Sequence, residues 1–288
     1  MKKPVYESPL CSRYASERMQ YIFSPDYKFL TWHRLWLALA ENEMALGLNV
    51  TAGQVAELRE NLEVIDYEAA DRYERALRHD VMAHIRAWGD HCPRARGIIH
   101  LGATSCYVDD NGDLIAYREA LRQIRMLLIN ALAALAGFAE KHADVPVLAY
   151  THYQAAQPTT LGKRACMWAQ DFLFDLERLD YELSRLPFYG CKGATGTGAS
   201  FLALFGGDAG KAMELERRIA SDMGFERVLP ICGQTYTRKL DYFILSVLSG
   251  IAQSASKMAT DLRLMAHEKE FDEPFTSSQV GSSAMAYK

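Results

Sequence analysis

The chain has 288 residues, of which 49% are hydrophobic and 24% are charged, a composition typical of globular proteins and unlike that of disordered or fibrous ones. Lysine and arginine number 32 against 36 aspartate and glutamate residues, so the formal net charge is -4. This balance disfavours general binding to nucleic acid, because no overall positive field attracts phosphate backbones. The length predicts about two domains.

The amino-terminal residues and the cysteines favour a cytoplasmic location. Lys2 and Lys3 are followed by Pro4 and Glu7 instead of the apolar run of a secretory signal. Six cysteines are scattered without a C-x-x-C pair, which disfavours both a disulfide framework and a thiolate zinc site. We therefore expect reduced thiols and no metal.

The first hundred residues predict a small domain of short helices. We expect helices over residues 27–46, over 53–61 after a cap at Thr51, and over 66–91 with a break near His79.

Three later segments predict much longer helices. Residues 113–142, 158–186 and 237–271 carry apolar side chains at the three-and-four spacing of a helix face, and Pro158 is expected in the first turn of the second helix. At 1.5 Å per residue each helix is roughly 45 Å long or more. Helices of this length bury their apolar faces by packing nearly antiparallel in a bundle.

These elements predict an all-α fold. A small N-terminal helical domain over residues 1–104 is expected to precede a long-helix bundle over residues 105–288. Strand signals are weak and confined to residues 145–150 and 228–231.

One segment of the bundle is apolar on almost every side. Residues 126–139 contain a polar interruption at Asn130 and are too short for the roughly 20 residues that cross a bilayer. We expect a helix buried in protein. Three helices are too few to cover it, so other copies of the chain should supply part of the cover. The sequence thus predicts a homo-oligomer.

Polar residues gather at the junctions between the predicted helices, where rigid scaffolding commonly holds catalytic loops. His79 is more often a capping or surface residue than a ligand, and His152 could be a general acid or a structural hydrogen-bond donor. His79, His84, His91 and Cys92 match no zinc-binding pattern. The polar clusters are residues 12–14, 78–80, 100–105, 151–154, 233–238 and 281–285.

Two glycine-led segments allow both structural and functional readings. Residues 190–198 follow a helix instead of a strand and lack GK[ST], which favours a flexible linker or a loop bordering an active site over a nucleotide loop. Residues 281–288 have the composition of a mobile loop, and a functional reading makes one serine a base or nucleophile supported by Lys288.

Taken together, the clusters resemble the adenylosuccinate lyase branch of the fumarase/aspartase superfamily. The superfamily's signature loop is GSSxMPxK, and RHDVMAH, HLGATS and GQTYTR favour this branch over its relatives. The matching segments, in family order across essentially the entire chain, are SRYAS, RHDVMAH, GIIHLGATSCYV, THYQ, GKR, KGATGT, GQTYTRK and GSSAMAYK.

The resemblance implies a carbon–nitrogen lyase of purine nucleotide biosynthesis. Such an enzyme releases fumarate by β-elimination from adenylosuccinate, giving AMP, and from succinylaminoimidazole carboxamide ribotide, giving the carboxamide ribotide. It also implies a homotetramer whose active sites each draw loops from three subunits, with no metal, organic cofactor, nucleic-acid partner or membrane.

The resemblance assigns roles to individual residues. By similarity Ser282 is the general base, and Lys288 supports the developing negative charge. His152 is the general acid that protonates the leaving nitrogen, and His79 orients the His152 side chain. Among the substrate-binding residues, the hydroxyls of Thr104 and Ser105 and the amide of Gln234 resemble the groups that bind the succinyl carboxylates in the family. The implied substrate-binding residues are Arg13, Tyr14, Arg78, Asp80, His100, Thr104, Ser105, Thr151, Gln234, Arg238 and Ser283.

The chain departs from the family pattern at three places. Ala155 and Ala286 stand where the family usually has proline. The chain also stops at Lys288, whereas family members continue through further bundle helices and a third helical domain. The resemblance therefore implies a bundle incomplete at its carboxyl end, with the C-terminal domain missing. Losing proline should give each loop more backbone freedom, worth about 0.4–1 kcal/mol. A protein ending at Lys288 is expected to keep its long helices but to turn over little substrate.

Two other functions are compatible with the sequence. One is another fumarate-releasing lyase such as argininosuccinate lyase. Competition experiments distinguish the two, because a pocket for a phosphate-bearing substrate should be blocked by AMP and not by arginine. The other is a catalytically silent, truncated scaffold. The presence of His79, His152, Ser282 and Lys288 together favours an enzyme.

Overall fold

The computed structural model describes residues 6–286, which form two compact units. The first unit comprises Met1–Ile124 and Tyr181–Asp241, and the second comprises Arg125–Asp180 and Tyr242–Lys288. Each unit is discontinuous in sequence because three long helices run from one into the other. The expected domain boundary at residue 104 stays a prediction, since these units divide the chain within its long helices.

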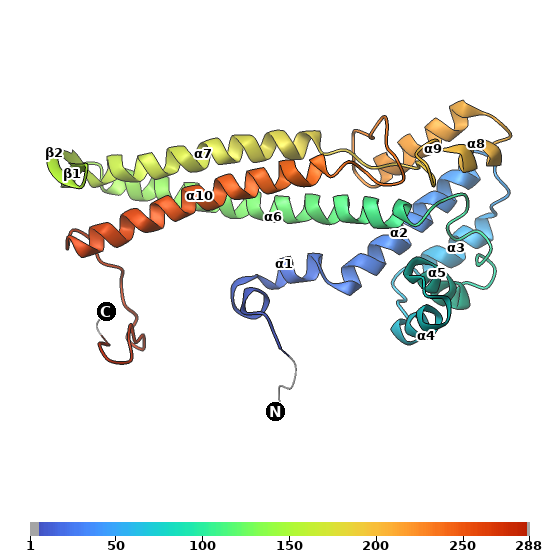
Figure 1. Cartoon of the computed structure of the whole chain (residues 1–288), viewed down its shortest axis with the longest axis horizontal. Coiled ribbons are helices and arrows are strands. Elements are labelled where there is room, and N and C mark those ends of the chain that lie inside the picture. The colour runs from blue at the N-terminus through green and yellow to red at the C-terminus, as the bar shows by residue number, and fades with distance from the viewer. Residues whose placement is uncertain (1–5, 287–288) are drawn as a thin grey trace. The chain divides into compact units, whose positions relative to one another are not determined.

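The first unit contains short helices before the first long one and two more near its carboxyl end. Helix α2 packs against α3 and α9, and α4 packs against α5. The elements are a turn of π-helix η1 (Leu10–Tyr14), α1 (Glu17–Ile22), α2 (Pro25–Ala45), α3 (Ala52–Glu60), α4 (Tyr67–Leu77), α5 (Asp80–His91), α8 (Ala199–Leu204) and α9 (Ala209–Asp222) (Figure 1).

Side-chain caps set where several of these helices begin. Thr51 and Gln54 form a capping box at the start of α3. Asp66 caps α4 and His79 caps α5 by accepting backbone N–H bonds. Arg78, with φ of 53°, ends α4 in the left-handed region. The predicted Thr51 cap and the predicted break near His79 are therefore confirmed.

The core of the first unit is built on the aromatic face of α2. Trp32 and Trp36 are each 1% exposed. His33 stacks on Trp88 with ring centroids 4.1 Å apart and planes inclined by 9°. This aromatic layer joins α2 to α5, because edge-to-face and stacked rings add to the free energy of area burial.

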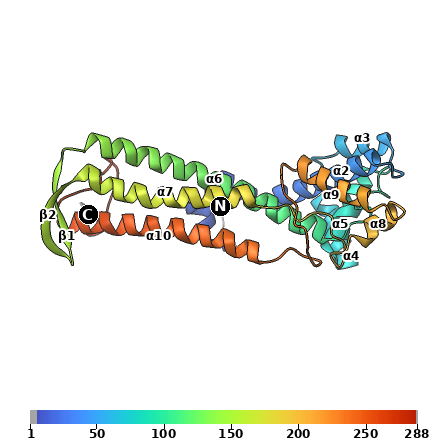
Figure 2. The ribbon, with the colours of Figure 1, turned by 90° about the horizontal axis from the view of Figure 1, so that it is seen from above.

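The second unit is a three-helix arrangement closed by a hairpin. The later part of α6, the first part of α7 and the later part of α10 lie side by side, and the antiparallel strands β1 and β2 connect α6 to α7 (Figures 1 and 2). The core includes Leu128, Leu135, Trp168, Phe172 and Met265. The elements are α6 (Cys106–Lys141), β1 (Pro146–Thr151), β2 (Gln154–Thr160), α7 (Leu161–Arg185) and α10 (Lys239–His267).

The predicted all-α class is confirmed, with this hairpin as its exception, and two local expectations are wrong. Pro158 lies in β2 opposite Leu148, and α7 begins at Leu161. Strand β2 has no alternating apolar pattern of its own and exists because β1 supplies its hydrogen-bond partners. Residues 228–231 form no strand; Val228 makes only one isolated bridge with Phe188.

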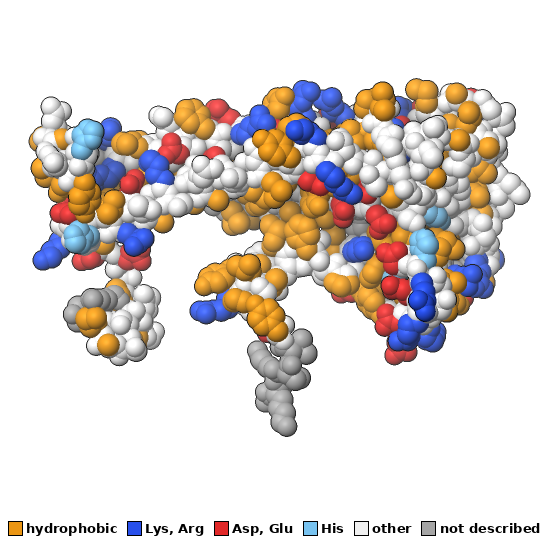
Figure 3. All heavy atoms as spheres, viewed as in Figure 1, with side chains coloured by type: hydrophobic (Ala, Val, Ile, Leu, Met, Phe, Trp, Pro, Cys, Tyr) orange, Lys and Arg blue, Asp and Glu red, His pale blue; other side chains and the backbone are white. Residues whose placement is uncertain are grey.

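The apolar segment of α6 is less buried than expected. Met126 and Leu127 are 48% and 57% exposed, although Leu128 is only 4% exposed. Helix α6 is long and apolar enough to cross a membrane by length and composition, a test that core helices also pass, and 17% of its most apolar window is buried. Figure 3 shows hydrophobic side chains gathered on the surface along this helix. One face of α6 is thus left without cover by residues 6–286.

Candidate active site

The predicted site residues divide between the two units. The clusters at residues 12–14, 78–80, 100–105 and 233–238 belong to the first unit, and those at 151–154 and 281–285 belong to the second. Lys288 lies outside the described residues.

In the first unit, Thr104 and Ser105 directly precede helix α6. The carbonyl of Thr104 accepts from Tyr107 N (2.8 Å) and that of Ser105 accepts from Asp109 N (3.1 Å). Both hydroxyls therefore stand at the amino end of a 36-residue helix. Unpaired N–H groups and the helix dipole favour anions at such an end, which suits the carboxylates that the resemblance assigns to these residues.

The turn before these residues is held by close packing. Gly102 has φ of 68°, and its carbonyl accepts from Ser200 Oγ. A Cβ at Gly102 would lie 2.5 Å from Leu204 of α8. The turn therefore requires glycine for both its backbone conformation and its contact with α8.

His100 enters the same turn as a neutral hydrogen-bonding group. Its Nδ1 accepts from Trp36 Nε1 at 2.8 Å. Burial, with a smaller contribution from His79, lowers the pKa of His100 to about 4. At pH 7 its Nε2 therefore carries the single ring proton and offers one donor without positive charge.

A network around Asp110 holds Gln234, a predicted binder of the succinyl carboxylates, and Arg238, a predicted substrate-binding residue. Asp110 is 3% exposed and its Oδ2 accepts from Tyr236 N at 2.6 Å. Arg238 Nη2 lies 3.7 Å from Asp110 Oδ1, and Tyr189 donates its hydroxyl to the carbonyl of Gln234. The loop bearing Gln234 is thus fixed beside the start of α6. Sequence reasoning missed Asp110, whose only signal is the aspartate pair Asp109 and Asp110 a few positions after Ser105.

The start of α5 carries His79 and Asp80. Burial and then the charge of Asp80 raise the pKa of Asp109 to about 6. His79 Nδ1 accepts from Met82 N at 3.3 Å and lies 3.7 Å from Asp80 Oδ1. The capping interpretation of His79 is therefore confirmed, and its Nε2 takes no part in the cap. Clusters 100–105 and 233–238 meet at the start of α6.

Arg13 and Tyr14 are not brought to this place. Tyr14 is 73% exposed, and the Arg13 guanidinium lies 5.8 Å from the centroid of its ring. Within residues 6–286, no hydrogen bond or ion pair joins either side chain to the other clusters.

In the second unit, His152 occupies the tip of the β-hairpin. His152 and Tyr153 have φ of 54° and 57°, and the pair Thr151 and Gln154 closes the two-residue turn. Turns with two positive φ angles normally contain glycine or asparagine, so His152 is held in an unfavourable conformation. Its side chain is exposed, and its ring nitrogens bond to no described residue.

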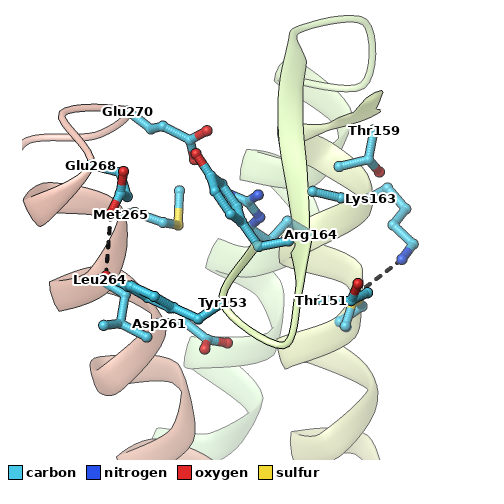
Figure 4. A pocket seen from close by; sticks show the side chains of 13 residues that line it. Thr151, Tyr153, Thr159, Lys163, Arg164, Asp261, Leu264, Met265, Glu268 and Glu270 are labelled. Atoms are coloured by element: carbon cyan, nitrogen blue, oxygen red, sulfur yellow. Dashed lines mark hydrogen bonds and ion pairs between the residues drawn. The ribbon is translucent and has the colours of Figure 1, made fainter. Parts of the chain in front are cut away.

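A cavity of about 410 Å³ lies under this hairpin, between the start of α7 and the end of α10 (Figure 4). Tyr153 donates its hydroxyl to Glu268 Oε1 at 3.2 Å. Arg164 pairs with Glu270 Oε2 at 3.0 Å and donates to the carbonyl of Leu148 at 2.7 Å. These bonds tie β1 to α7 and tie the turn to the residues just after α10, so the cavity wall supports the turn that carries His152.

Ser282 and Ser283 lie in a short loop closed by its own backbone. Gly281 N donates to the carbonyl of Ala286 at 3.1 Å. Ser282 is half-buried and Ser283 is exposed. No hydrogen bond in the described part of the chain links Ser282 to His152, so this structure does not bring the predicted base and acid into contact.

The glycine-rich segment 190–198 is a tightly packed connection. A Cβ at Gly196 would overlap the carbonyl of Cys232. Asn111 donates to the carbonyl of Gly190 and accepts from its N–H, each at 3.1 Å. The segment borders the loop that carries Gln234, and that this loop borders an active site stays a prediction. Among residues 6–286 no group of three or more His, Cys, Asp or Glu side chains could hold a metal ion.

Comparison with known proteins places these observations in a family context. A model of the lyase family matches residues 39–288. Adenylosuccinate lyase of Saccharomyces cerevisiae is 50% identical over 286 residues, covering 98% of this chain and 59% of the relative. The enzyme of the same name from Schizosaccharomyces pombe is 46% identical over the same shares. The chain thus spans about three fifths of the length of these relatives.

The fold has a close counterpart among solved structures. A fumarate lyase from Mesorhizobium sp. BNC1 superposes with a TM-score of 0.79 at 23% identity, covering 91% of this chain and 59% of that one. At this level of identity the likeness concerns the fold alone.

Proposed function

This chain belongs to the lyase family, and from that premise we propose that its protein cleaves adenylosuccinate into AMP and fumarate. We extend the proposal to the succinyl-carboxamide ribotide of purine synthesis, which loses fumarate by the same chemistry. The observation that carries the proposal is the 50% identity to a named adenylosuccinate lyase over 98% of this chain.

The reaction is a β-elimination that moves one proton off carbon and one onto nitrogen. In this proposal Ser282, as an alkoxide, takes the proton from the carbon next to a succinyl carboxylate. The carbon–nitrogen bond then breaks with its electron pair leaving on nitrogen, and His152 protonates that nitrogen as general acid. Lys288 supports the negative charge that develops on the substrate.

The first unit supplies groups suited to holding the substrate's carboxylates. Thr104 and Ser105 stand at the amino end of α6, and the Asp110 network fixes the loop of Gln234 beside them. Hydroxyl, amide and backbone N–H donors fixed in advance stabilise the substrate carboxylate more as it becomes a dianion than in its singly charged ground state.

We also propose that other copies of the chain complete the active site in a homotetramer. The exposed apolar face of α6 supports this, because apolar surfaces of such length are normally covered in the functional assembly. A cytoplasmic location is part of the proposal, since the six cysteines are all unpaired thiols and suit a reducing compartment.

The test follows fumarate release by the ultraviolet change on mixing the purified protein with adenylosuccinate. Ser282→Ala and His152→Ala are each expected to lose at least about 100-fold in turnover, because each removes a proton-transfer group. Circular dichroism should show unchanged helical content. AMP should compete with the substrate, whereas arginine should not.

Ser277→Ala and His267→Ala are matched controls, since both residues are exposed and lie in the second unit. Both should retain wild-type turnover. Full turnover by either Ser282→Ala or His152→Ala would contradict the proposed mechanism.

A further inference from the structure

A second cavity, of about 420 Å³, lies in the first unit among helices α1, α2, α6 and α9. Its lining shares no residue with the polar clusters of the candidate active site. Three arginines line it, Arg18, Arg34 and Arg118. Three guanidinium groups around one cavity are unusual in a chain whose net charge is -4.

Arg118 is fixed in place by the structure around it. Its side chain is 12% exposed, and its Nη1 donates to the carbonyls of Met223 (2.8 Å) and Gly224 (2.9 Å) just after α9. Its Cζ also lies 4.1 Å from the centroid of the Phe225 ring. A guanidinium held on three sides loses little conformational entropy when it meets a ligand.

Arg18 and Arg34 have no ion-pair partner within the described part of the chain. Arg18 lies over the Tyr21 ring at 5.8 Å, and Arg34 is exposed. Their charges are therefore available to a ligand entering the cavity.

Tyr27 lines the same cavity as the three arginines. The residue is 7% exposed, and no described group forms a hydrogen bond with its hydroxyl. Burial and then the charge of Glu119 raise the pKa of Tyr27, while the charges of Arg34, Arg118 and Arg18 act in the opposite direction. The hydroxyl can therefore donate to an oxygen of a ligand in this cavity.

The acidic residues of the lining are already engaged. Glu119 Oε1 accepts from Arg118 Nε at 3.2 Å and from Arg122 Nη1 at 2.7 Å. Asp222 Oδ2 accepts from Asn42 Nδ2 at 2.6 Å. The three guanidinium groups of the lining outnumber these two carboxylates, so the lining carries a positive excess of one charge.

We propose that this cavity binds a small anionic metabolite, whose phosphate or carboxylate group is held by Arg18 and Arg34 near Arg118 with the Tyr27 hydroxyl as a further donor. Guanidinium groups bind both oxyanions through paired N–H donors. Ile115 and Met223 line the same cavity and give the organic part of the ligand an apolar wall.

Calorimetric titration of the protein at constant ionic strength tests the proposal, with inorganic phosphate in one arm and succinate in the other. The wild type should bind at least one of them at a site that Arg18→Gln/Arg34→Gln weakens by about tenfold or more, as expected on losing charged hydrogen bonds. Tighter binding of phosphate than of succinate indicates a phosphorylated ligand, whereas tighter binding of succinate indicates a ligand that is held by its carboxylate.

Arg72→Gln/Arg75→Gln is the matched control, because it removes the same charge from exposed positions of α4 in the same unit. It should bind as the wild type does. Tyr27→Phe removes only a hydroxyl and should weaken binding by severalfold with the fold intact. Equal binding by wild type and Arg18→Gln/Arg34→Gln, or equal loss in the control, would overturn the proposal. The readout is independent of turnover, so its failure leaves the proposed lyase activity untouched.

Discussion

Glu43 on helix α2 is fully buried, and neither of its carboxyl oxygens has a hydrogen-bond partner in residues 6–286. Burial raises its pKa to about 9, against 4.5 for the group in water. The carboxyl is therefore neutral in the folded protein at pH 7, because an ionised group at this place would lack both solvent and a partner.

This shift makes stability depend on pH. The folded-state pKa lies above the unfolded value, so between pH 4.5 and 9 the unfolded chain releases a proton that the folded chain keeps, and stability falls as pH rises. The free energy of unfolding of the wild type should fall between pH 5 and pH 8. In Glu43→Gln we expect this fall to be smaller by on the order of 1–3 kcal/mol, because the titrating group is gone. Urea denaturation at both pH values measures it. Glu60→Gln, at an exposed position of α3, should leave the pH dependence as in the wild type.

Single residues were predictable where their signals are local. Thr51 was identified as a cap from its place before a helical pattern. Asp110 was not, because its role depends on Tyr236, 126 positions away. The burial of Glu43 was not predicted for the same reason, because its neighbours in the sequence do not reveal that both of its carboxyl oxygens are buried.

Among the elements, the turn at residues 100–105 depends on a helix that follows it by about a hundred positions. Gly102 packs against Leu204 and Phe201 of α8, and Ser200 of the same helix donates to its carbonyl. The position of Thr104 and Ser105 is therefore set jointly by the start of α6 and by α8.

Gly102→Ala should destabilise the protein by about 1–3 kcal/mol, because the added methyl group meets Leu204 and alanine disfavours the positive φ. Chemical denaturation measures the change. Gly53→Ala is the control: nothing lies within 4 Å of its Cβ position in α3, so stability should stay unchanged or rise slightly. Adding Leu204→Ala to Gly102→Ala tests the two causes separately, since it makes room for the methyl group but leaves the backbone strain.

The elements that periodicity predicted are those with long apolar faces or clear caps, such as α2, α3 and the three long helices. Strand β2 and the six-residue helix α8 were not predicted. The first takes its conformation from pairing with β1, and the second is too short to show a helical repeat. Tertiary partners, which a single sequence does not display, decide both.

For the whole molecule, the uncovered face of α6 bears on association. Leu127 is 57% exposed, and we expect Leu127→Glu to shift the protein from a tetramer toward smaller species, because a carboxylate is costly in an apolar contact. Light scattering after size-exclusion chromatography measures the mass. Circular dichroism should be unchanged, since this side chain is exposed in the single chain. Lys141→Glu, at the end of the same helix, should assemble normally, and an unchanged mass for Leu127→Glu would argue against this interface.

The sequence predicted the helical class and the length of the bundle helices, since both follow from patterns within single segments. It did not predict two units that each combine distant segments. The boundary between the units falls inside α6, between Ile124 and Arg125, where the helix continues without the turn or glycine that would mark a domain boundary in the sequence.

Because the first unit consists of two separate stretches of sequence, the ribosome synthesises its two parts at different times. Residues Met1–Ile124 emerge first, but α9, which packs on α2, belongs to Tyr181–Asp241. At ordinary elongation rates of about 5–20 residues per second, the nascent chain waits on the order of ten seconds between the two. During that interval the surface of α2 that will meet α9 is bare, and Asp110 has no Tyr236 to bind. Translation must pass Asp241 before the amino-terminal half can close, so chaperones that shield emerging chains have their longest opportunity there.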